Sequence, residues 1–227
     1  MRDDALYLVI DQGGHASRAL VYDIRGRKVA ESYVKIGTKR TPPDVVEHDP
    51  NELVESIERA CRETLDELGD DASRLQCAGM ATQRSSIVAW DKDTGAALSP
   101  VISWQDRRAA DDMVHIYDAS ALVRDQTGLV VSPHYGASKI RWCLDHLDAV
   151  RAARARDALV IGPRASFLLY RLTQERRTLV DPANASRTLL WNRHTRDWSA
   201  ELCELFGIAP ELLPASVTSR HEYGGLN

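Results

Sequence analysis

The stretch "VIDQGGHASRALVYD", residues 9–23, decides the fold because it reads as a strand, a tight turn and a second strand. An apolar run over residues 6–10 leads into Asp11, two glycines and a histidine follow, and a second strand is predicted over residues 18–23. Two interpretations are open at this point. A Gly-Gly turn is common in plain β-hairpins, and a glycine-rich turn can also bind a phosphate through converging backbone N–H groups.

The elements that follow predict an α/β domain. One helix is well marked, because apolar side chains recur every four residues after Pro50 until Gly69 ends the pattern. The stretch "LQCAGMAT", residues 75–82, reads as a short buried strand. Further strands are predicted at residues 29–36, 86–90 and 101–104, and further helical stretches around residues 106–125 and 136–156. Residues 157–172 could form a strand, a helix or both, since "ALVIG" (158–162) is typical of a strand and "ASFLLYRL" (165–172) of a helix. This order of elements predicts a mixed sheet flanked by helices.

Composition excludes several classes of protein. The 227 residues carry a formal net charge of −4, which gives no electrostatic reason to expect a nucleic acid or a membrane surface as partner. No apolar run approaches the ~20 residues of a spanning helix, and the acidic N-terminus does not resemble a signal peptide. The four scattered cysteines lack metal-site spacing and indicate a reducing, cytoplasmic setting.

Six stretches together are similar to the N-terminal domain of the FGGY carbohydrate kinases, and within that family to its glycerol kinase branch. They occur in family order and span nearly the whole chain: "DQGGHASRALVYD" (11–23), "VEHDP" (46–50), "TQRSSIVAWDKDTG" (82–95), "ISWQDRR" (102–108), "TGLVVSPHYGASKIRW" (127–142) and "DPANASRTLLWN" (181–192). The resemblance implies a ribonuclease H-like, actin-like ATPase fold. It also implies an ATP-dependent kinase that phosphorylates a hydroxyl of a sugar or polyol.

The resemblance further implies that residues 1–227 form the substrate-side domain. The ATP-binding domain, with the aspartate that serves as general base, is then expected outside this chain, and the fragment alone is expected to be inactive. The opening hairpin takes the position of the family's phosphate hairpin, with Asp11 as the acid associated with Mg²⁺. The other residues that it places at the phosphates of ATP are Gln12, Gly13, Gly14, His15 and Arg18.

Gly14 and His15 depart from the family pattern, which has two threonines at these positions in glycerol kinases. The loss of both hydroxyls is expected to weaken the phosphate contact. A protonated His15 could replace part of it, or His15 could be a solvated turn residue. The departure motivates an alternative function, in which a degenerate family member binds a sugar or metabolite with little or no phosphoryl transfer.

The resemblance also identifies a substrate side, made of Gln83, Arg84, Ser85, Trp104, Asp106 and His134. Arg84 is expected to donate to substrate hydroxyls unless it is a salt-bridged surface residue. Trp104 is expected to pack on the carbon face of the substrate unless it belongs to the core. Asp106 is expected either to accept a sugar hydroxyl or to pair with Arg107 or Arg108.

The substrate positions predict a ligand other than glycerol. Ser85 stands where glycerol kinases have a glutamate, and His134 stands where they have a tyrosine. A larger polyol or ketose, of about five carbons, is therefore expected. The sequence does not fix the oligomeric state, and a homo-oligomer is one alternative.

Overall fold

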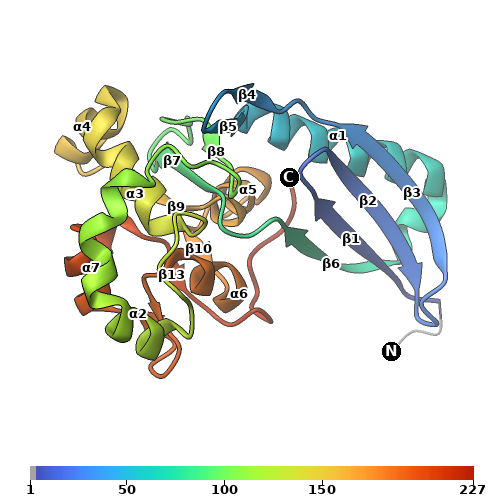
Figure 1. Cartoon of the computed structure of the whole chain (residues 1–227). Coiled ribbons are helices and arrows are strands. Elements are labelled where there is room, and N and C mark those ends of the chain that lie inside the picture. The colour runs from blue at the N-terminus through green and yellow to red at the C-terminus, as the bar shows by residue number, and fades with distance from the viewer. Residues whose placement is uncertain (1–3) are drawn as a thin grey trace. The chain divides into compact units, whose positions relative to one another are not determined.

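The structure is a computed structural model that describes residues 4–227. The described chain forms two compact units, and both are discontinuous in the sequence. Unit 1 combines the chain up to Thr38 with Asn51–Gln83, and unit 2 combines Lys39–Pro50 with Arg84–Asn227. The chain therefore leaves unit 1 after its third strand, returns to it for one helix and one strand, and ends in unit 2 (Figure 1).

Unit 1 contains a mixed four-stranded sheet with the order β3-β2-β1-β6. Its strands are β1 (Leu6–Gln12), β2 (Ala16–Asp23), β3 (Lys28–Lys35) and β6 (Leu75–Thr82). The first three strands are antiparallel neighbours, and β6 runs parallel to β1. Burial alternates along β1, with Leu6, Leu8 and Ile10 inside, as expected for a sheet with one face covered.

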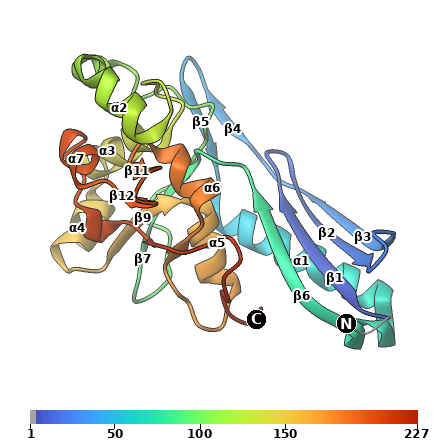
Figure 2. The same ribbon diagram turned by 90° about the horizontal axis from the view of Figure 1, so that it is seen from below.

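Helix α1 (Pro50–Leu68) covers that face of the sheet (Figures 1 and 2). Leu53 and Ile57, from the predicted four-residue pattern, are buried. Polar bonds tie the helix to the sheet as well, because the Ser17 and Ser56 hydroxyls lie 2.8 Å apart and Thr64 donates to the Ala19 carbonyl. A 3₁₀ turn, η1 (Gly69–Arg74), follows the helix. The predicted strands and helix of this region are confirmed.

Strand β6 differs from its prediction. It forms where expected, but the side chains of residues 76–79 are exposed rather than buried. Within the described residues, β6 pairs only with β1 and is the edge strand of its sheet. Alanine, glycine and cysteine are often buried in proteins, but at this edge position their residue type does not decide burial.

Unit 2 is built on a five-stranded sheet with the order β4-β5-β8-β7-β9. Its strands are β4 (Lys39–Thr41), β5 (Val45–His48), β7 (Ile87–Asp91), β8 (Val101–Ile102) and β9 (Leu159–Pro163). The central strands β7 and β9 are buried along their whole length. Trp90 of β7 is fully buried and meets the Phe167 ring edge-on at a centroid distance of 5.8 Å.

Helices cover this second sheet from both sides. Helices α3 (Gly136–His146) and α4 (Asp148–Ala155) pack against β7 and β9 from one side, and α5 (Arg164–Leu172) packs from the other (Figures 1 and 2). The remaining elements are η2 (Asp111–Ala119), α2 (Ser120–Thr127), β10 (Leu179–Val180), α6 (Pro182–Ala185), η3 (Ser186–Thr188), β11 (Trp191–Asn192), β12 (Asp197–Trp198), α7 (Ala200–Leu205), η4 (Pro210–Leu212) and β13 (Ala215–Ser216).

The two predicted long helices of unit 2 are each divided. The stretch predicted over residues 106–125 begins only at Asp111 and changes from 3₁₀ to α-helix at Ser120. The stretch predicted over residues 136–156 is interrupted at Leu147, whose backbone is extended. All four cysteines are free thiols. Among residues 4–227, no helix combines the length and the apolar character needed to cross a membrane.

Candidate active site

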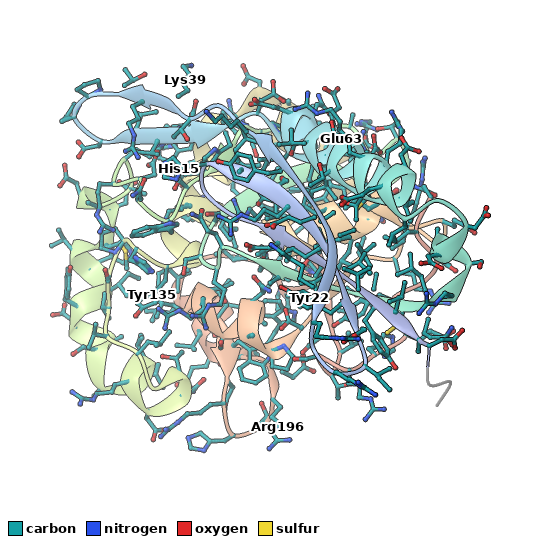
Figure 3. The ribbon with its side chains drawn as sticks, turned by 90° about the vertical axis from the view of Figure 1, so that its right-hand side faces the viewer. His15, Tyr22, Lys39, Glu63, Tyr135 and Arg196 are labelled. Atoms are coloured by element: carbon teal, nitrogen blue, oxygen red, sulfur yellow. The ribbon has the colours of Figure 1, made fainter. Side chains whose placement is uncertain are left out.

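The β1–β2 turn of unit 1 presents two backbone donors. Gly13 N–H donates to the Ala16 carbonyl at 2.9 Å and closes the turn. The backbone N–H groups of Gly14 and His15 have no hydrogen-bond partner within the described part of the chain. His15 is exposed and lies at the turn end of the hairpin (Figure 3). Adjacent unpaired N–H groups of this kind form an anion-binding surface.

A carboxylate and a guanidinium flank the turn. Asp11 and Arg18 are partners in the β1–β2 register, and Arg18 Nη1 lies 3.9 Å from Asp11 Oδ2. Nearly half of each side chain is exposed, so both can reach a ligand in solvent. Arg18 also lies over the Tyr33 ring at 5.7 Å. Gln12, by contrast, is fully buried, and its amide donates to the Gly13 carbonyl at 2.8 Å. Gln12 therefore holds the turn from inside.

The glycines of this turn are needed for space rather than for backbone conformation. Neither Gly13 nor Gly14 has a positive φ. A Cβ at Gly14 would overlap the side-chain amide of Gln83, whereas a Cβ at Gly13 would lie 3.2 Å from the Ala16 carbonyl oxygen. Gln83 thus packs beside the β1–β2 turn of unit 1.

We expect Gly14→Ala to destabilise unit 1 by about 1 kcal/mol or less, because the new Cβ meets the far end of the flexible Gln83 side chain, which can move to another rotamer. The Gln83→Ala change should remove most of that cost, and a double-mutant cycle measured by urea unfolding would show the coupling. Gly79→Ala in β6 is the matched control, since a Cβ there meets no atom within 4 Å. Equal losses with and without Gln83→Ala would contradict the proposed overlap.

The residues of unit 2 that the resemblance assigns to the substrate lie around the start of β7. Arg84 is exposed and forms no ion pair within the described chain, so the salt-bridged alternative is absent. Ser85 is strained, with φ of 66°, and it is only 2% exposed. Its hydroxyl has no hydrogen-bond partner among the described residues. Backbone strain of this kind persists where the surroundings enforce it and is common at functional sites.

Trp104 and His134 form the aromatic part of this side. The backbone N–H of Trp104 donates to the Ser86 hydroxyl at 3.2 Å, and this hydrogen bond connects the loop after β8 to the start of β7. The Trp104 ring is half-buried, and its centroid lies 5.3 Å from that of His134. His134 in turn meets Tyr135 edge-on at 5.0 Å. Trp104 is therefore not a core residue.

Asp106 pairs with Arg108, which is one of the two roles expected for it, and does not face a sugar hydroxyl. Its carboxylate is 1% exposed and accepts hydrogen bonds from the Val46 N–H at 2.7 Å and from Arg108 through both oxygens. Arg108 also donates to Glu47 at 2.7 Å. Burial lowers the pKa of Arg108, but its bonds to Asp106 and Glu47 outweigh burial and raise it. Asp106 is thus a loop-positioning residue with no accessible oxygen for a sugar.

Lys139 holds the loop that carries His134, a role that the sequence reading missed. Its ammonium donates to the carbonyls of Pro133, His134 and Tyr135 at 2.6–3.0 Å, and the residue is 1% exposed. The pKa of Lys139 is lowered to about 7, mainly by burial; Asp106 opposes this effect, and Arg107 and Arg108 add to it.

This pKa predicts a pH dependence of stability. The pKa of an unfolded lysine is about 10.4, so between pH 7 and 10 the unfolded chain binds more protons than the folded one. Stability should therefore rise with pH over this range, by at most about 1.4 kcal/mol per unit. Lys139→Met should abolish that slope, measured by urea unfolding between pH 7.0 and 8.5. An unchanged slope would show that Lys139 keeps an ordinary pKa.

Among the described residues, no group of three or more histidine, cysteine or acidic side chains could hold a metal ion. Beside the β1–β2 turn, Asp11 offers an accessible carboxylate. Mg²⁺ commonly keeps several waters and binds through one or two carboxylates together with substrate phosphates. The donor set of the hairpin therefore fits Mg²⁺ that arrives with a nucleotide and does not fit a resident metal.

Comparison with known proteins agrees with this architecture. Residues 6–227 match the N-terminal domain of the FGGY family of carbohydrate kinases. Glycerol kinases from Ralstonia pickettii and Leptothrix cholodnii are 37% and 38% identical over 219 residues, which cover 96% of this chain and 44% of each relative. This chain thus spans less than half the length of these relatives.

Solved structures agree on the fold. The glycerol kinase of Plasmodium falciparum with ADP superposes with a TM-score of 0.89 at 24% identity, over 98% of this chain and 45% of that one. A xylulose kinase from Rhodospirillum rubrum superposes at 0.85 with 22% identity, over 98% and 45%. The predicted ribonuclease H-like, actin-like fold is confirmed. The chain belongs to the FGGY family of carbohydrate kinases.

Proposed function

We propose that this chain is the substrate-side half of an ATP-dependent carbohydrate kinase, which transfers a phosphoryl group to a hydroxyl of a sugar or polyol. The observation that carries the proposal is the β1–β2 turn, where two unpaired N–H groups lie beside an accessible carboxylate in a chain of this family. Phosphoryl transfer needs positioning and charge neutralisation rather than covalent chemistry from the protein, and these groups supply both.

On the phosphate side, we infer that the N–H groups of Gly14 and His15 donate to oxygens of the terminal phosphate. Arg18 neutralises negative charge there, and Gly13 permits close approach of the backbone. Asp11 would hold Mg²⁺ through water, and the ion would screen charge on the phosphates. The exposed His15 imidazole stands in place of a threonine hydroxyl and can donate when it is protonated.

On the substrate side, the polar groups are suited to a polyol. Arg84 has guanidinium donors free in solvent, and these fit adjacent hydroxyls. Trp104 offers a half-buried aromatic face for the C–H side of the ligand. The unpaired Ser85 hydroxyl and the His134 ring complete this side. Burial lowers the pKa of His134, and nearby Lys139, Arg187 and Arg107 lower it further, so its ring is neutral at pH 7.

The rest of the proposed enzyme is a second domain. The relatives are about twice as long as this chain, which is consistent with a C-terminal domain that binds ATP and supplies the general base. Because Ser85 and His134 differ from glycerol kinases, we infer a larger polyol or ketose as substrate. Four free thiols and the need for ATP favour a reducing cytoplasmic location.

A chimera tests the proposal. The chain would be joined after Asn227 to the C-terminal half of the Ralstonia pickettii glycerol kinase, and ADP release would be measured with a panel of polyols and ketoses. We expect substrate-dependent turnover from the chimera and none from the 227-residue chain. Asp11→Ala should abolish turnover, whereas Asp118→Ala on the exposed face of η2 should not. Turnover by the 227-residue chain alone would refute the assignment of ATP binding and the general base to a second domain. If the chimera binds none of the carbohydrates, the proposed function is wrong.

A further inference from the structure

Lys139 is a buried cation at a place that disfavours positive charge. It lies in the first turn of α3, and the residue is only 1% exposed. Burial disfavours the charged form of a lysine, and the positive end of a helix dipole disfavours it as well. The ammonium is therefore retained by the groups that it binds locally, and these belong to the loop before the helix.

Three carbonyl groups, rather than a carboxylate, bind this ammonium. Nζ donates to the carbonyls of Pro133, His134 and Tyr135 at 2.6, 2.8 and 3.0 Å. A lysine ammonium has three N–H donors and no acceptor, so these bonds use all of its donors. A neutral amine keeps only two N–H donors, and one of the three carbonyls would then lose its partner.

The hydrogen bonds within the loop itself are long. The His134 N–H donates to the Ser132 hydroxyl at 3.2 Å, and the Tyr135 N–H donates to the Ser132 carbonyl at 3.3 Å. Both distances lie at or beyond the long end of normal N–H···O bonds. The bonds from Lys139 are shorter and charge-assisted, and such bonds are stronger than neutral ones. The backbone position of His134 therefore depends mainly on Lys139.

His134 connects this loop to the proposed substrate side. The centroid of its ring lies 5.3 Å from that of the half-buried Trp104 ring. Trp104 is held independently, because its backbone N–H donates to the Ser86 hydroxyl. A movement of the loop would thus change the spacing of the two rings. Binding sites tolerate little displacement of the groups that contact the ligand, so the state of Lys139 affects the site without contact with the ligand.

We propose that Lys139 is a positioning residue for the carbohydrate, and that its ammonium form holds His134 in the geometry that binds the ligand. The proposal rests on the proposed function and concerns the regulation of the same site by pH. Because binding selects the ammonium form, it takes up a proton wherever Lys139 of the free chain is neutral. The affinity for carbohydrate is then expected to fall as the pH rises.

The charges around Lys139 allow it to titrate near neutral pH. Burial is the main cause that lowers the pKa of Lys139 to about 7, Asp106 opposes it, and Arg107 and Arg108 add to it. The pKa of His134 is also lowered, mainly by burial, so its ring is mainly neutral above pH 7. The other charged groups on elements packed against α3 are Asp91 on β7, which pairs with Arg156, Arg187 on η3, and Asp148, Arg151 and Arg154 on α4.

Calorimetric titration of the 227-residue chain tests the proposal with glycerol, xylitol, sorbitol and D-xylulose as probes. For the probe that binds most tightly, we expect the affinity to fall by roughly 5- to 15-fold from pH 7.0 to 8.5, because the binding-competent form becomes scarce. Titrations at pH 7.5 in HEPES and in Tris, which differ in ionisation enthalpy, should show uptake of about half a proton on binding.

Variants assign that proton to Lys139. Lys139→Met should bind weakly, without pH dependence and without proton uptake. Lys139→Arg keeps its charge over this range, so it should bind without pH dependence and more tightly than Lys139→Met. The control is Lys92→Met, an exposed position beyond the other end of β7 that pairs with Asp157, and it should keep the profile of the unmodified chain. A lysine with a merely structural role would change the free energy of unfolding with pH but not the affinity of the folded chain.

The remaining outcomes separate the two proposals. If the affinity of the unmodified chain is constant between pH 7.0 and 8.5, or if binding takes up no proton, the role of Lys139 is wrong while the kinase proposal stands. This result decides even if Lys139→Met does not fold. A folded Lys139→Met chain that keeps the pH profile overturns the assignment in the same way. If neither these probes nor the wider carbohydrate panel bind, the proposed function fails together with this inference.

Discussion

Replacing Asp106 by alanine is expected to lower the free energy of unfolding by about 3–5 kcal/mol, the usual cost of breaking a buried ion pair from one side. The side chain of Arg108 is only 10% exposed, so it cannot regain water when its main partner is lost. The Val46 N–H also loses its acceptor. Because this N–H belongs to β5, the change should disturb the five-stranded sheet as well as the loop.

Urea unfolding followed by circular dichroism would measure this loss. Asp118→Ala, a change of the same type at an exposed position of η2, should shift stability by less than about 0.5 kcal/mol. Asp106→Asn should lower the free energy of unfolding by an amount between these two, because an amide retains one acceptor oxygen but no charge. If Asp106→Ala unfolds as the unmodified chain does while still weakening carbohydrate binding, then Asp106 contacts the ligand and our structural assignment is wrong.

Trp104→Ala is expected to weaken carbohydrate binding by roughly 30- to 150-fold, corresponding to about 2–3 kcal/mol for a buried aromatic contact. The ring is half-buried beside His134, so it is available to a ligand rather than enclosed in the core. Calorimetric titration with the tightest-binding member of the panel gives the affinity. Stability should change much less than affinity, because the backbone bond from Trp104 to Ser86 does not depend on the side chain.

Two variants sharpen that test. Trp198→Phe should leave the affinity unchanged, because its ring packs against Val180, Ala185 and Trp191 and against the main core of unit 2. Trp104→Phe should recover most of the lost affinity, since it restores an aromatic face. An affinity that is unchanged in Trp104→Ala would exclude this residue from the ligand site.

The sequence predicts unit 1 well because its signals are local. The hairpin, the third strand and helix α1 depend on alternation, turn residues and a four-residue apolar period, and all are confirmed. The exposure of β6 was not predictable, because it depends on which neighbours the strand acquires. The late start of η2 was not predictable either. The Asp106 carboxylate accepts a hydrogen bond from the Arg108 N–H within its own loop, and an apolar periodicity does not reveal such a bond.

The candidate site divides in the same way. Arg84, Trp104 and the hairpin were identified from residue types in family order, which fixes position along the chain. What Asp106 and Lys139 do could not be read from the sequence, because each acts through partners far apart in sequence or through three carbonyls of one loop. The space available for a side chain at Gly14 is likewise limited by Gln83, which lies nearly seventy positions away in the sequence.

The excursion of residues 39–50 into unit 2 has a consequence for biosynthesis. Every strand and the helix of unit 1 are complete once residue 83 has left the ribosome, and domains generally fold as units in the order of synthesis. Strand β5, however, pairs with β8, His48 opposite Val101, so it must wait for a partner that has not yet been made. The nascent chain therefore exposes the β5 edge of the β4–β5 hairpin during this interval. The charged Glu47 on β5 opposes pairing of that edge with other chains.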